Sequence, residues 1–343
     1  MKKKHKIGLV LGGGGGKGAY QAGVLKALQE YKIDKYITHI SGTSIGAINA
    51  VAFLSGGADK CVDVWENIDN SIALTKKSLK DIIVGKSLFS RDGFIDVAKR
   101  EIDFDKVSNS KINTFVIAAP IGRKNANAQD KFKLNGLKKD EIINILLATS
   151  AIPYIYEPVY INGIRYKDGY AVDNVPIKAL KDEGCDTIFV VPLREYSPGP
   201  VYANNYTTII DFVSGYNDYG FLDGTLDFDK DRAKMRIEHG YEVGKQLIEK
   251  LIREGVIAIK WRHKIRQKWI NYKNKKNYKE INYYYSLKKS EITHKPRESE
   301  EDITMNEGIP KLKVEGNKKK FFHGGSKKND KENQPEKSVN KRI

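Results

Sequence analysis

Short apolar runs alternate with helical patterns along the first 260 residues of the chain. Continuous apolar runs of the length of a buried strand occupy residues 7–11, 37–40, 113–119 and 187–191. Between them, apolar residues recur at helical spacing from Ala19, from Ile45, over 138–148, after Val175 and over 229–253. This alternation predicts an α/β fold, in which helices flank a mostly parallel central sheet.

Two further signals add antiparallel strands and a break. Residues 131–135 alternate like a strand with one face in water, and Asn162-Gly163 joins two strand-like segments. Because Asn-Gly suits a type I′ turn, a β-hairpin is predicted there. Gly56-Gly57 interrupts the helical pattern that starts at Ile45. Residues 76–110 mix short helices with polar turns, which would suit a segment that covers the functional site formed around residues 37–50.

The segment from Ile37 to Ala50 predicts a strand that turns sharply into a helix, with Ser44 at the corner. Gly42 and Gly46 flank this serine in the pattern Gly-x-Ser-x-Gly. Glycines permit close backbone approach, so the serine hydroxyl can stand at a helix N-terminus as a nucleophile. The competing interpretation is a glycine-rich turn that contains a serine by chance.

A glycine-rich loop, Gly12 to Gly18, follows the first strand and precedes a helix. Its backbone N–H groups could bind a phosphate, a dinucleotide or an oxyanion. A phosphate-binding P-loop is excluded, because Leu11 and Gly18 stand where it needs Gly and Ser or Thr. The dinucleotide pattern fits Gly13, Gly15 and Gly18, with Asp34 further on, so a dinucleotide-binding oxidoreductase stays open as an alternative.

Two details weigh on that alternative. Asp34 precedes the next strand instead of ending it, and that strand then carries a serine motif for which a nucleotide site has no use.

Lys17 would oppose the dipole of the following helix. Either a carboxylate, a carbonyl or an anionic ligand compensates for its charge, or the side chain is solvated.

A serine nucleophile needs a base. Among the six histidines only His239, on a predicted helix, could complete a Ser, Asp, His order. A carboxylate in a dry site could act directly instead, because burial makes it more basic. Asp168-Gly169, at the end of the predicted hairpin, is the candidate, although Asp before Gly is also a common turn former.

The glycine loop, the Gly42-to-Gly46 motif and Asp168-Gly169 stand in this order, with Ala148 to Pro153 between the last two. Together they closely resemble the patatin-like phospholipase family, over about residues 5–195. The resemblance implies a three-layer α/β/α fold with Ser44 as nucleophile and Asp168 as base, without histidine. It also implies that the backbone N–H groups of Gly13, Gly14 and Gly15 are the oxyanion donors. The positions that support these motifs are Gly16, Lys17, Gly18, Gly42, Gly46 and Gly169.

By this resemblance the chain is a serine acyl hydrolase of phospholipase A or lysophospholipase type, acting on lipid esters without a cofactor. A carboxylesterase or thioesterase with other acyl substrates is the alternative within the same chemistry. Tyr170 departs from the family pattern, which has a small residue beside the Asp, so the substrate preference is open.

Most of the net charge of +17 lies beyond residue 259. We therefore expect a hydrolase domain over 1–259, a basic aromatic amphipathic extension over 260–293 and a disordered basic tail over 294–343. A helical stripe of Ile257, Trp261, Ile265, Trp269 and Tyr272 predicts peripheral contact with an anionic membrane through residues 256–289. Packing of the stripe on the domain is an alternative, and single-stranded nucleic acid a less expected one.

The cysteines and the N-terminal segment bear on location. Cys61 and Cys185 are far apart and have no metal-ligand spacing, which fits a reduced intracellular setting. The lysine-rich start resembles a signal peptide, but its apolar run ends after five residues, so we interpret it as the first strand. No apolar run is long enough to span a membrane. A cytoplasmic protein, at most peripheral at the inner membrane surface, is expected.

Overall fold

A computed structural model describes residues 5–78, 80–82, 87–123, 125, 128–196, 207–213 and 220–257, and the backbone of 283–286. All of them belong to one compact unit that ends at Pro296. The predicted tail, residues 294–343, and most of the extension before it lie outside the described residues.

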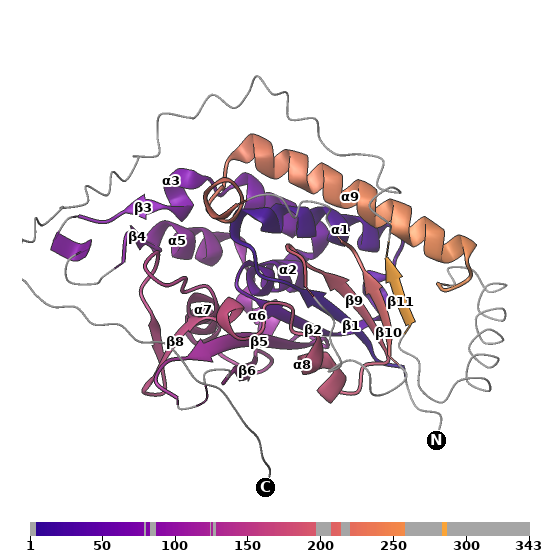
Figure 1. Cartoon of the computed structure of the whole chain (residues 1–343), viewed down its shortest axis with the longest axis horizontal. Helices are drawn as coiled ribbons and strands as arrows, with labels where there is room; N and C mark the ends of the chain where they lie inside the picture. The colour runs from indigo at the N-terminus through magenta and orange to yellow at the C-terminus, as the bar shows by residue number, and fades with distance from the viewer. Residues whose placement is uncertain are drawn as a thin grey trace, which may run out of the picture. The chain divides into compact units, whose positions relative to one another are not determined.

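A mixed sheet forms the centre of this unit (Figure 1). Its strands run in the order β11-β10-β9-β1-β2-β5-β8-β7, and β6 pairs with β5 beside this path. Six of them, from β11 to β5, are parallel, and β6, β7 and β8 are antiparallel. The bounds are β1 (Ile7–Leu11), β2 (Ile37–Thr43), β5 (Asn113–Pro120), β6 (Asp130–Lys133), β7 (Val159–Ile161), β8 (Ile164–Asp168), β9 (Thr187–Val191), β10 (Thr208–Asp211) and β11 (Tyr283–Ser286).

Helices cover both faces of the sheet. The bounds of the longer helices are α1 (Ala19–Glu30), α2 (Ile45–Glu66), α5 (Asp92–Glu101), α7 (Lys139–Thr149) and α9 (Lys230–Arg253). Shorter elements are α3 (Asn70–Ala73), β3 (Thr75–Lys76), β4 (Phe89–Ser90), α6 (Phe104–Ser108), α8 (Ile177–Asp182), the 3-10 turns η1 (Gly15–Gly18), η2 (Asp34–Tyr36) and η3 (Gly169–Ala171), and the π-helical turn η5 (Phe221–Thr225).

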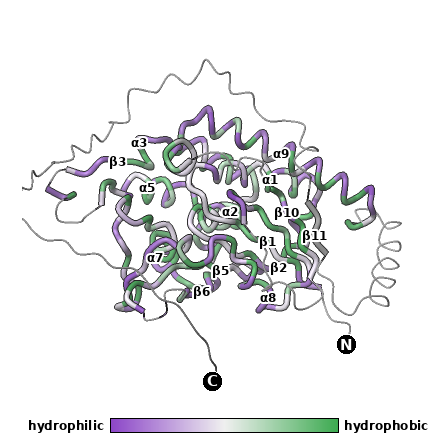
Figure 2. Tube along the Cα trace, in the orientation of Figure 1, coloured by the Kyte–Doolittle hydropathy of each residue, from purple (hydrophilic) through white to green (hydrophobic). Residues whose placement is uncertain are grey.

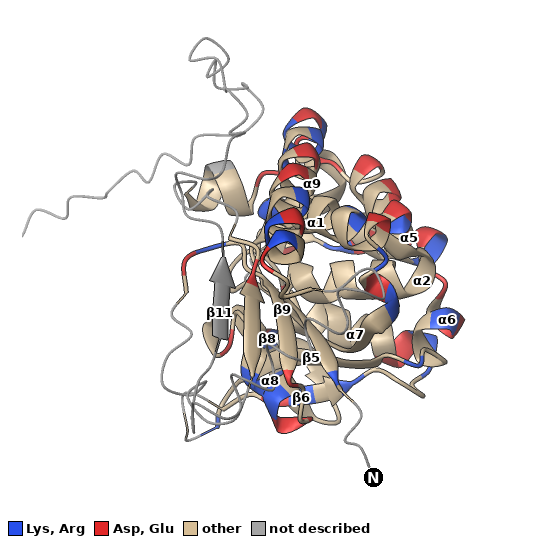
Figure 3. Ribbon diagram, turned by 90° about the vertical axis from the view of Figure 1, so that its right-hand side faces the viewer, with Lys and Arg blue, Asp and Glu red and all other residues tan. Residues whose placement is uncertain are grey.

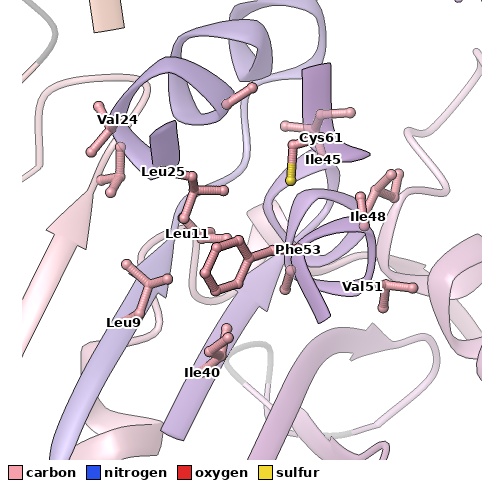
Figure 4. Close-up of a cluster of buried hydrophobic side chains, with 14 of the residues drawn as sticks. Leu9, Leu11, Val24, Leu25, Ile40, Ile45, Ile48, Val51, Phe53 and Cys61 are labelled. Atoms are coloured by element: carbon pink, nitrogen blue, oxygen red, sulfur yellow. The ribbon is translucent and has the colours of Figure 1, made fainter. Parts of the chain in front are cut away.

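Alternation along the strands divides the core between the two faces. Leu9 and Leu11 of β1 point to the face covered by α1 and α2, whereas Val10 between them packs with Ile177 and Leu180 of α8. Figure 4 shows the first face, where Leu9, Leu11 and Ile40 of the strands meet helix side chains that include Leu25 and Phe53. The predicted three-layer α/β/α architecture is confirmed.

Hydropathy and charge follow these layers. The central strands are mostly green in Figure 2, while α9 is largely hydrophilic on the outside. Lys, Arg, Asp and Glu lie mainly on the outer faces of α9, α1, α5 and α6 (Figure 3). In the part of the chain that the structure describes, no helix is both long and apolar enough to cross a membrane.

Local signals in the sequence located several elements well. The first strand, the strand over 187–191 and the start of α1 at Ala19 are as predicted. Asn162 and Gly163 have φ of 50° and 78°, as a type I′ turn requires, and join β7 to β8. The break at Gly56-Gly57 is a kink inside α2, where these two glycines leave helical geometry. Two strands at one edge, β10 and β11, were not predicted, and β11 lies within the predicted extension.

Candidate active site

Ser44 occupies a sharp turn between β2 and α2. Its φ is 53° and its ψ is −128°, a conformation that non-glycine residues seldom adopt. Ser44 is only 5% exposed. The predicted strand, turn and helix around this residue are therefore present, with the serine at the N-terminal end of a long helix.

Gly42 and Gly46 are required because the backbone crosses itself tightly at this turn. A Cβ at Gly46 would lie 2.1 Å from the carbonyl oxygen of Leu11, and one at Gly42 would lie 2.7 Å from the backbone of Ala47. Both distances are too short for any side chain. The two glycines thus let α2 start directly against the ends of β1 and β2.

Asp168 lies beside Ser44, although 124 residues separate them. The Ser44 hydroxyl donates a hydrogen bond of 2.7 Å to Oδ2 of Asp168. The other carboxylate oxygen, Oδ1, accepts from the backbone N–H of Tyr170 at 2.8 Å. Asp168 ends β8, which pairs with β5 beside β2, and this pairing brings the hairpin to the serine turn.

Burial changes the acidity of Asp168. The side chain is 2% exposed, and desolvation raises its pKa to about 7, against the hydrogen bonds from Tyr170 and Ser44 and the positive charge of Arg91. Arg91 donates to the carbonyl oxygens of Leu147 and Glu157, so it is held near the site. A carboxylate with this pKa can accept a proton near neutral pH.

Thr149, at the end of α7, stabilises the serine turn by hydrogen bonds. Its Oγ1 accepts a hydrogen bond of 2.8 Å from the backbone N–H of Ser44 and donates one of 2.5 Å to the carbonyl of Ile117. Thr149 is completely buried. One hydroxyl therefore connects the strained serine to the neighbouring strand β5.

The glycine loop passes beside Ser44 and is held by Asn174. A Cβ on Gly13 would lie 3.2 Å from the Ser44 Cβ and 2.6 Å from Oδ1 of Asn174. Gly13 and Asn174 exchange two hydrogen bonds, because the Gly13 N–H donates to the Asn174 carbonyl at 3.1 Å and the Asn174 side chain donates back at 3.2 Å. For the N–H groups of Gly14 and Gly15, no acceptor is recorded among the described residues.

The segment 224–227 and Arg236 hold the other side of the loop. Cβ atoms on Gly15 and Gly16 would lie 1.9 Å and 1.7 Å from the carbonyl oxygens of Thr225 and Asp227. The buried guanidinium of Arg236, on α9, donates to the carbonyl of Gly16 at 3.3 Å and to the carboxylate of Asp227 at 2.7 Å. Arg232 forms a second ion pair with Asp227 at 2.9 Å.

The remaining predicted motif residues lie around this centre. Gly18 packs against Ile45 and Trp65, and a Cβ there would come within 2.5 Å of Ile45. Gly169 abuts Ile117, whose carbonyl oxygen would lie 2.2 Å from an added Cβ. Lys17 is half-buried within η1, directly before α1.

Two alternative candidates lie elsewhere. His239 is buried on α9, and its ring centroid lies 5.7 Å from that of Tyr20. The Ser44 hydroxyl donates its hydrogen bond to Asp168 and not to this histidine. Asp34 lies before the amino end of β2, while the glycine loop follows the carboxyl end of the parallel strand β1. This carboxylate is therefore at the opposite end of the sheet and does not complete a dinucleotide site.

A cavity of about 400 Å³ begins two residues after Asp168, at Tyr170. It is lined by two segments, residues 170–175 and 194–196. Tyr170 and Asn174 belong to this lining and also contact Asp168 and Gly13. The guanidinium of Arg194 lies 4.8 Å from the ring centre of Tyr170. The unusual tyrosine beside Asp168 thus forms part of the cavity wall.

The sequence analysis assigned no role to Thr149, Asn174 or Arg236, although Thr149 lies in the segment from Ala148 to Pro153 that contributes to the family resemblance. Thr149 and Asn174 act through bonds to backbone atoms, for which the sequence has no signature. Arg236 did leave a signal, because it falls on the same stripe of α9 as the buried residues Ala233, Gly240 and Val243. An arginine within an apolar stripe indicates a buried partner.

Comparison with known proteins gives relatives of low identity. Residues 9–181 match the sequence model of the family described as Patatin-like phospholipase. An uncharacterized protein of Escherichia coli, YjjU, is 26% identical over 54% of this chain and 51% of its own length. Lysophospholipase nte1 of Aspergillus terreus is 23% identical over 75% of this chain and 19% of its own. The chain thus spans about half or less of these relatives.

One solved structure that matches this chain is VipD from Legionella pneumophila, with a TM-score of 0.41 at 14% identity. That alignment covers 72% of this chain and 67% of VipD. The family match covers half of the chain and includes the glycine loop, Ser44 and Asp168. The chain belongs to the patatin-like phospholipase family.

Proposed function

We propose that this protein is a serine acyl hydrolase that cleaves fatty acyl esters of lipids, of phospholipase A or lysophospholipase type. The observation that carries the proposal is the 2.7 Å hydrogen bond from the hydroxyl of Ser44, on its strained turn, to the buried carboxylate of Asp168. Membership of the patatin-like phospholipase family and the lysophospholipases among the relatives support lipid esters as the substrate class.

In the first step, Asp168 accepts the proton of the Ser44 hydroxyl while the oxygen attacks the ester carbonyl carbon. The carbonyl oxygen becomes an oxyanion. When the tetrahedral intermediate collapses, the bond to the alcohol breaks, and Asp168 returns the proton to this leaving group. The product is an acyl ester on Ser44.

In the second step, water attacks the acyl carbon while Asp168 accepts a proton from it. Collapse releases the fatty acid, and the proton returns to Ser44. The same carboxylate thus alternates between base and acid in both steps. Its raised pKa suits this exchange, because the proton is held neither too weakly nor too strongly near neutral pH.

The glycine loop would stabilise the oxyanion. We assign this role to the N–H groups of Gly14 and Gly15, since the N–H of Gly13 donates to Asn174. Gly13 would contribute by its position next to Ser44, or as a third donor if its bond to Asn174 opens. One such donor contributes about 3 kcal/mol to lowering the barrier.

Site-directed variants test the dyad. We expect Ser44→Ala and Asp168→Asn to abolish hydrolysis of a p-nitrophenyl acyl ester and of lysophospholipid. The control is His239→Gln, with folding checked by circular dichroism, which should retain activity. A loss of activity in a folded His239→Gln variant would favour a Ser-Asp-His triad over the dyad.

A fluorophosphonate probe tests the nucleophile directly. We expect a covalent adduct on Ser44, located by peptide mass spectrometry, and no adduct in Ser44→Ala. An unlabelled Ser44 in active protein would contradict the proposal. A panel of phospholipids, lysophospholipids, simple carboxylic esters and acyl thioesters then distinguishes a lipase of this type from a carboxylesterase or thioesterase.

The predicted division at residues 259 and 293, peripheral membrane contact through residues 256–289 and a cytoplasmic location also stay proposals. Charge supports the membrane contact, because residues 260–279 contain many Lys and Arg and no acidic residue. Flotation with anionic vesicles, with and without residues 256–343, tests this contact.

A further inference from the structure

Large apolar side chains are exposed on turns near the proposed site. In the part of the chain that the structure describes, six such side chains are exposed: Tyr36, Tyr154, Tyr160, Tyr170, Phe221 and Leu222. Three of these, Tyr170, Phe221 and Leu222, lie on turns that contact the glycine loop or Asp168, and Tyr154 lies three residues after Ala151, which accepts a hydrogen bond from Asp168. We call these four side chains the mouth patch.

Phe221 and Leu222 begin the π-helical turn η5, and Leu222 is 64% exposed. The last residue of this turn, Thr225, touches the glycine loop, since its carbonyl oxygen lies where a Cβ of Gly15 would stand. The backbone of Asp227 abuts Gly16 in the same way. The turn that presents two apolar side chains to solvent is therefore packed on the proposed oxyanion loop.

Tyr170 and Tyr154 belong to the side of the base. The N–H of Tyr170 donates to Asp168, while its ring is exposed beside Arg194. Tyr154 follows Ala151, whose carbonyl accepts from the N–H of Asp168 at 2.9 Å. Tyr154 is 81% exposed and has a φ of 69°, which is rare for a bulky residue.

We propose that the mouth patch docks the protein on the surface of neutral phospholipid aggregates. This inference deepens the proposed function, because the surface would deliver the lipid ester to that site. Ser44 and Asp168 are buried, so an acyl ester has to leave the aggregate to reach them. Tyrosine suits the boundary between water and lipid, and Phe and Leu suit the acyl region beneath it.

A lipid surface is favoured over a protein partner by the placement of the patch. Its members lie on three separate turns, two of them connected to Asp168 and one packed on the glycine loop, so the patch spans both parts of the proposed site. Tyr36 provides a matched control. Tyr36 is exposed to a similar degree, 58%, but it lies directly before β2, whereas Ser44 lies directly after β2. The seven residues of this strand separate the two by about 23 Å.

Vesicle flotation of the full chain tests this inference. The Ser44→Ala variant is mixed with phosphatidylcholine vesicles in high salt, which screens the basic tail. We expect it to float with the vesicles. Adding Phe221→Ser with Leu222→Ser, or Tyr154→Asn, should lower the partition coefficient at least about tenfold. Asn is chosen because it tolerates positive φ. Adding Tyr36→Ser should not change the partition coefficient.

Failure to bind neutral vesicles, or equal binding by the patch variants, would overturn the inference. So would dimerisation in sedimentation experiments that the patch variants abolish, since the patch would then be a protein interface. Circular dichroism checks the fold, and Leu222→Asn alone replaces a double variant that unfolds. Binding by an inactive variant does not depend on hydrolysis. Failure of the docking surface and failure of the proposed function are therefore distinguishable.

Discussion

Arg236 and Gly16 are joined by a hydrogen bond of 3.3 Å, although 220 residues separate them. The same guanidinium pairs with Asp227, whose backbone abuts Gly16. The position of the proposed oxyanion loop therefore depends on a buried ion pair at the base of α9. This support lies outside residues 9–181, the part of the chain that matches the family.

Replacement of this arginine should affect stability and rate together. Arg236→Met removes one ion-pair partner of the buried Asp227, which keeps its pair with Arg232, and removes the bond to Gly16. We expect the free energy of unfolding to fall by about 3 kcal/mol. We also expect kcat on a soluble ester to fall roughly tenfold, as a misplaced oxyanion donor would cause. Urea unfolding and steady-state kinetics measure the two effects. Arg253→Met, on the exposed end of the same helix, is the control; equal behaviour of both variants would contradict the role of Arg236.

Thr149 allows the strained serine turn to be tested by a nearly isosteric change. Thr149→Val leaves the buried N–H of Ser44 without an acceptor, which costs about 1–3 kcal/mol. We expect a lower unfolding free energy and a kcat reduced roughly tenfold, with KM little changed. Thr149→Ser keeps the hydroxyl and should restore both values. If Val and Ser behave alike, the hydrogen bond is not what holds Ser44 in place.

The pKa of Asp168 predicts how its replacement changes stability with pH. Burial raises this pKa to about 7, above the value of about 3.9 for an unfolded chain, so the folded state binds the proton more tightly. Its contribution to stability is full below about pH 4 and is lost as the pH rises to about 7. Asn cannot ionise.

We therefore expect Asp168→Asn to raise the free energy of unfolding at about pH 8, by on the order of 2 kcal/mol, and to change it little at about pH 4. Urea denaturation at both pH values measures this. Wild-type protein measured in parallel is the reference at each pH. A destabilised Asp168→Asn at the higher pH would mean that the carboxylate is better stabilised in the fold than its burial indicates.

The same pKa predicts the pH profile of activity. In the proposed mechanism Asp168 must be deprotonated to accept the serine proton, so kcat/KM should rise as the pH passes about 7 and then level off. Asp173, in the adjoining cavity wall, has a pKa raised to about 6 by burial and is the nearest competitor for this limb. The limb should persist in Asp173→Asn. Its disappearance there would assign the titration to Asp173.

Close packing at Gly46 predicts a severe effect from one methyl group. In Gly46→Ala the Cβ would lie 2.1 Å from the carbonyl oxygen of Leu11, and backbone cannot move aside as a flexible side chain can. We expect a loss of about 2–3 kcal/mol in unfolding free energy and displacement of the glycine loop, with loss of activity. Gly93→Ala, on α5, is the control, because its Cβ would come no closer than 3.2 Å to another residue, at the carbonyl oxygen of Ile72. Similar costs for both would contradict the packing argument.

What could be predicted from sequence follows from the range of the interactions. The first strand, the serine turn and the Asn162-Gly163 hairpin depend on residues a few positions apart, and their patterns indicated them correctly. Asp168 was different. Physical reasoning offered a carboxylate and His239 as bases, and only the resemblance to a family selected Asp168, because no local pattern reports a contact across 124 residues.

The residues that hold the site in place could not be predicted from the sequence for a related reason. Asn174 and Thr149 bind backbone atoms of distant segments, and any residue there has such atoms. The prediction of oxyanion donors at Gly13, Gly14 and Gly15 did not foresee that the N–H of Gly13 has an acceptor in Asn174. Strand β10, between β11 and β9, has only four residues, Thr208–Asp211, too few to give a clear alternation.

The contacts of the glycine loop also determine when the site can be completed during synthesis. The loop and Ser44 leave the ribosome early, Asp168 and Asn174 follow, and Asp227 and Arg236 come last. A nascent chain therefore has its nucleophile long before the oxyanion loop has its final supports. Hydrolysis should therefore begin only after α9 has emerged and packed on α1.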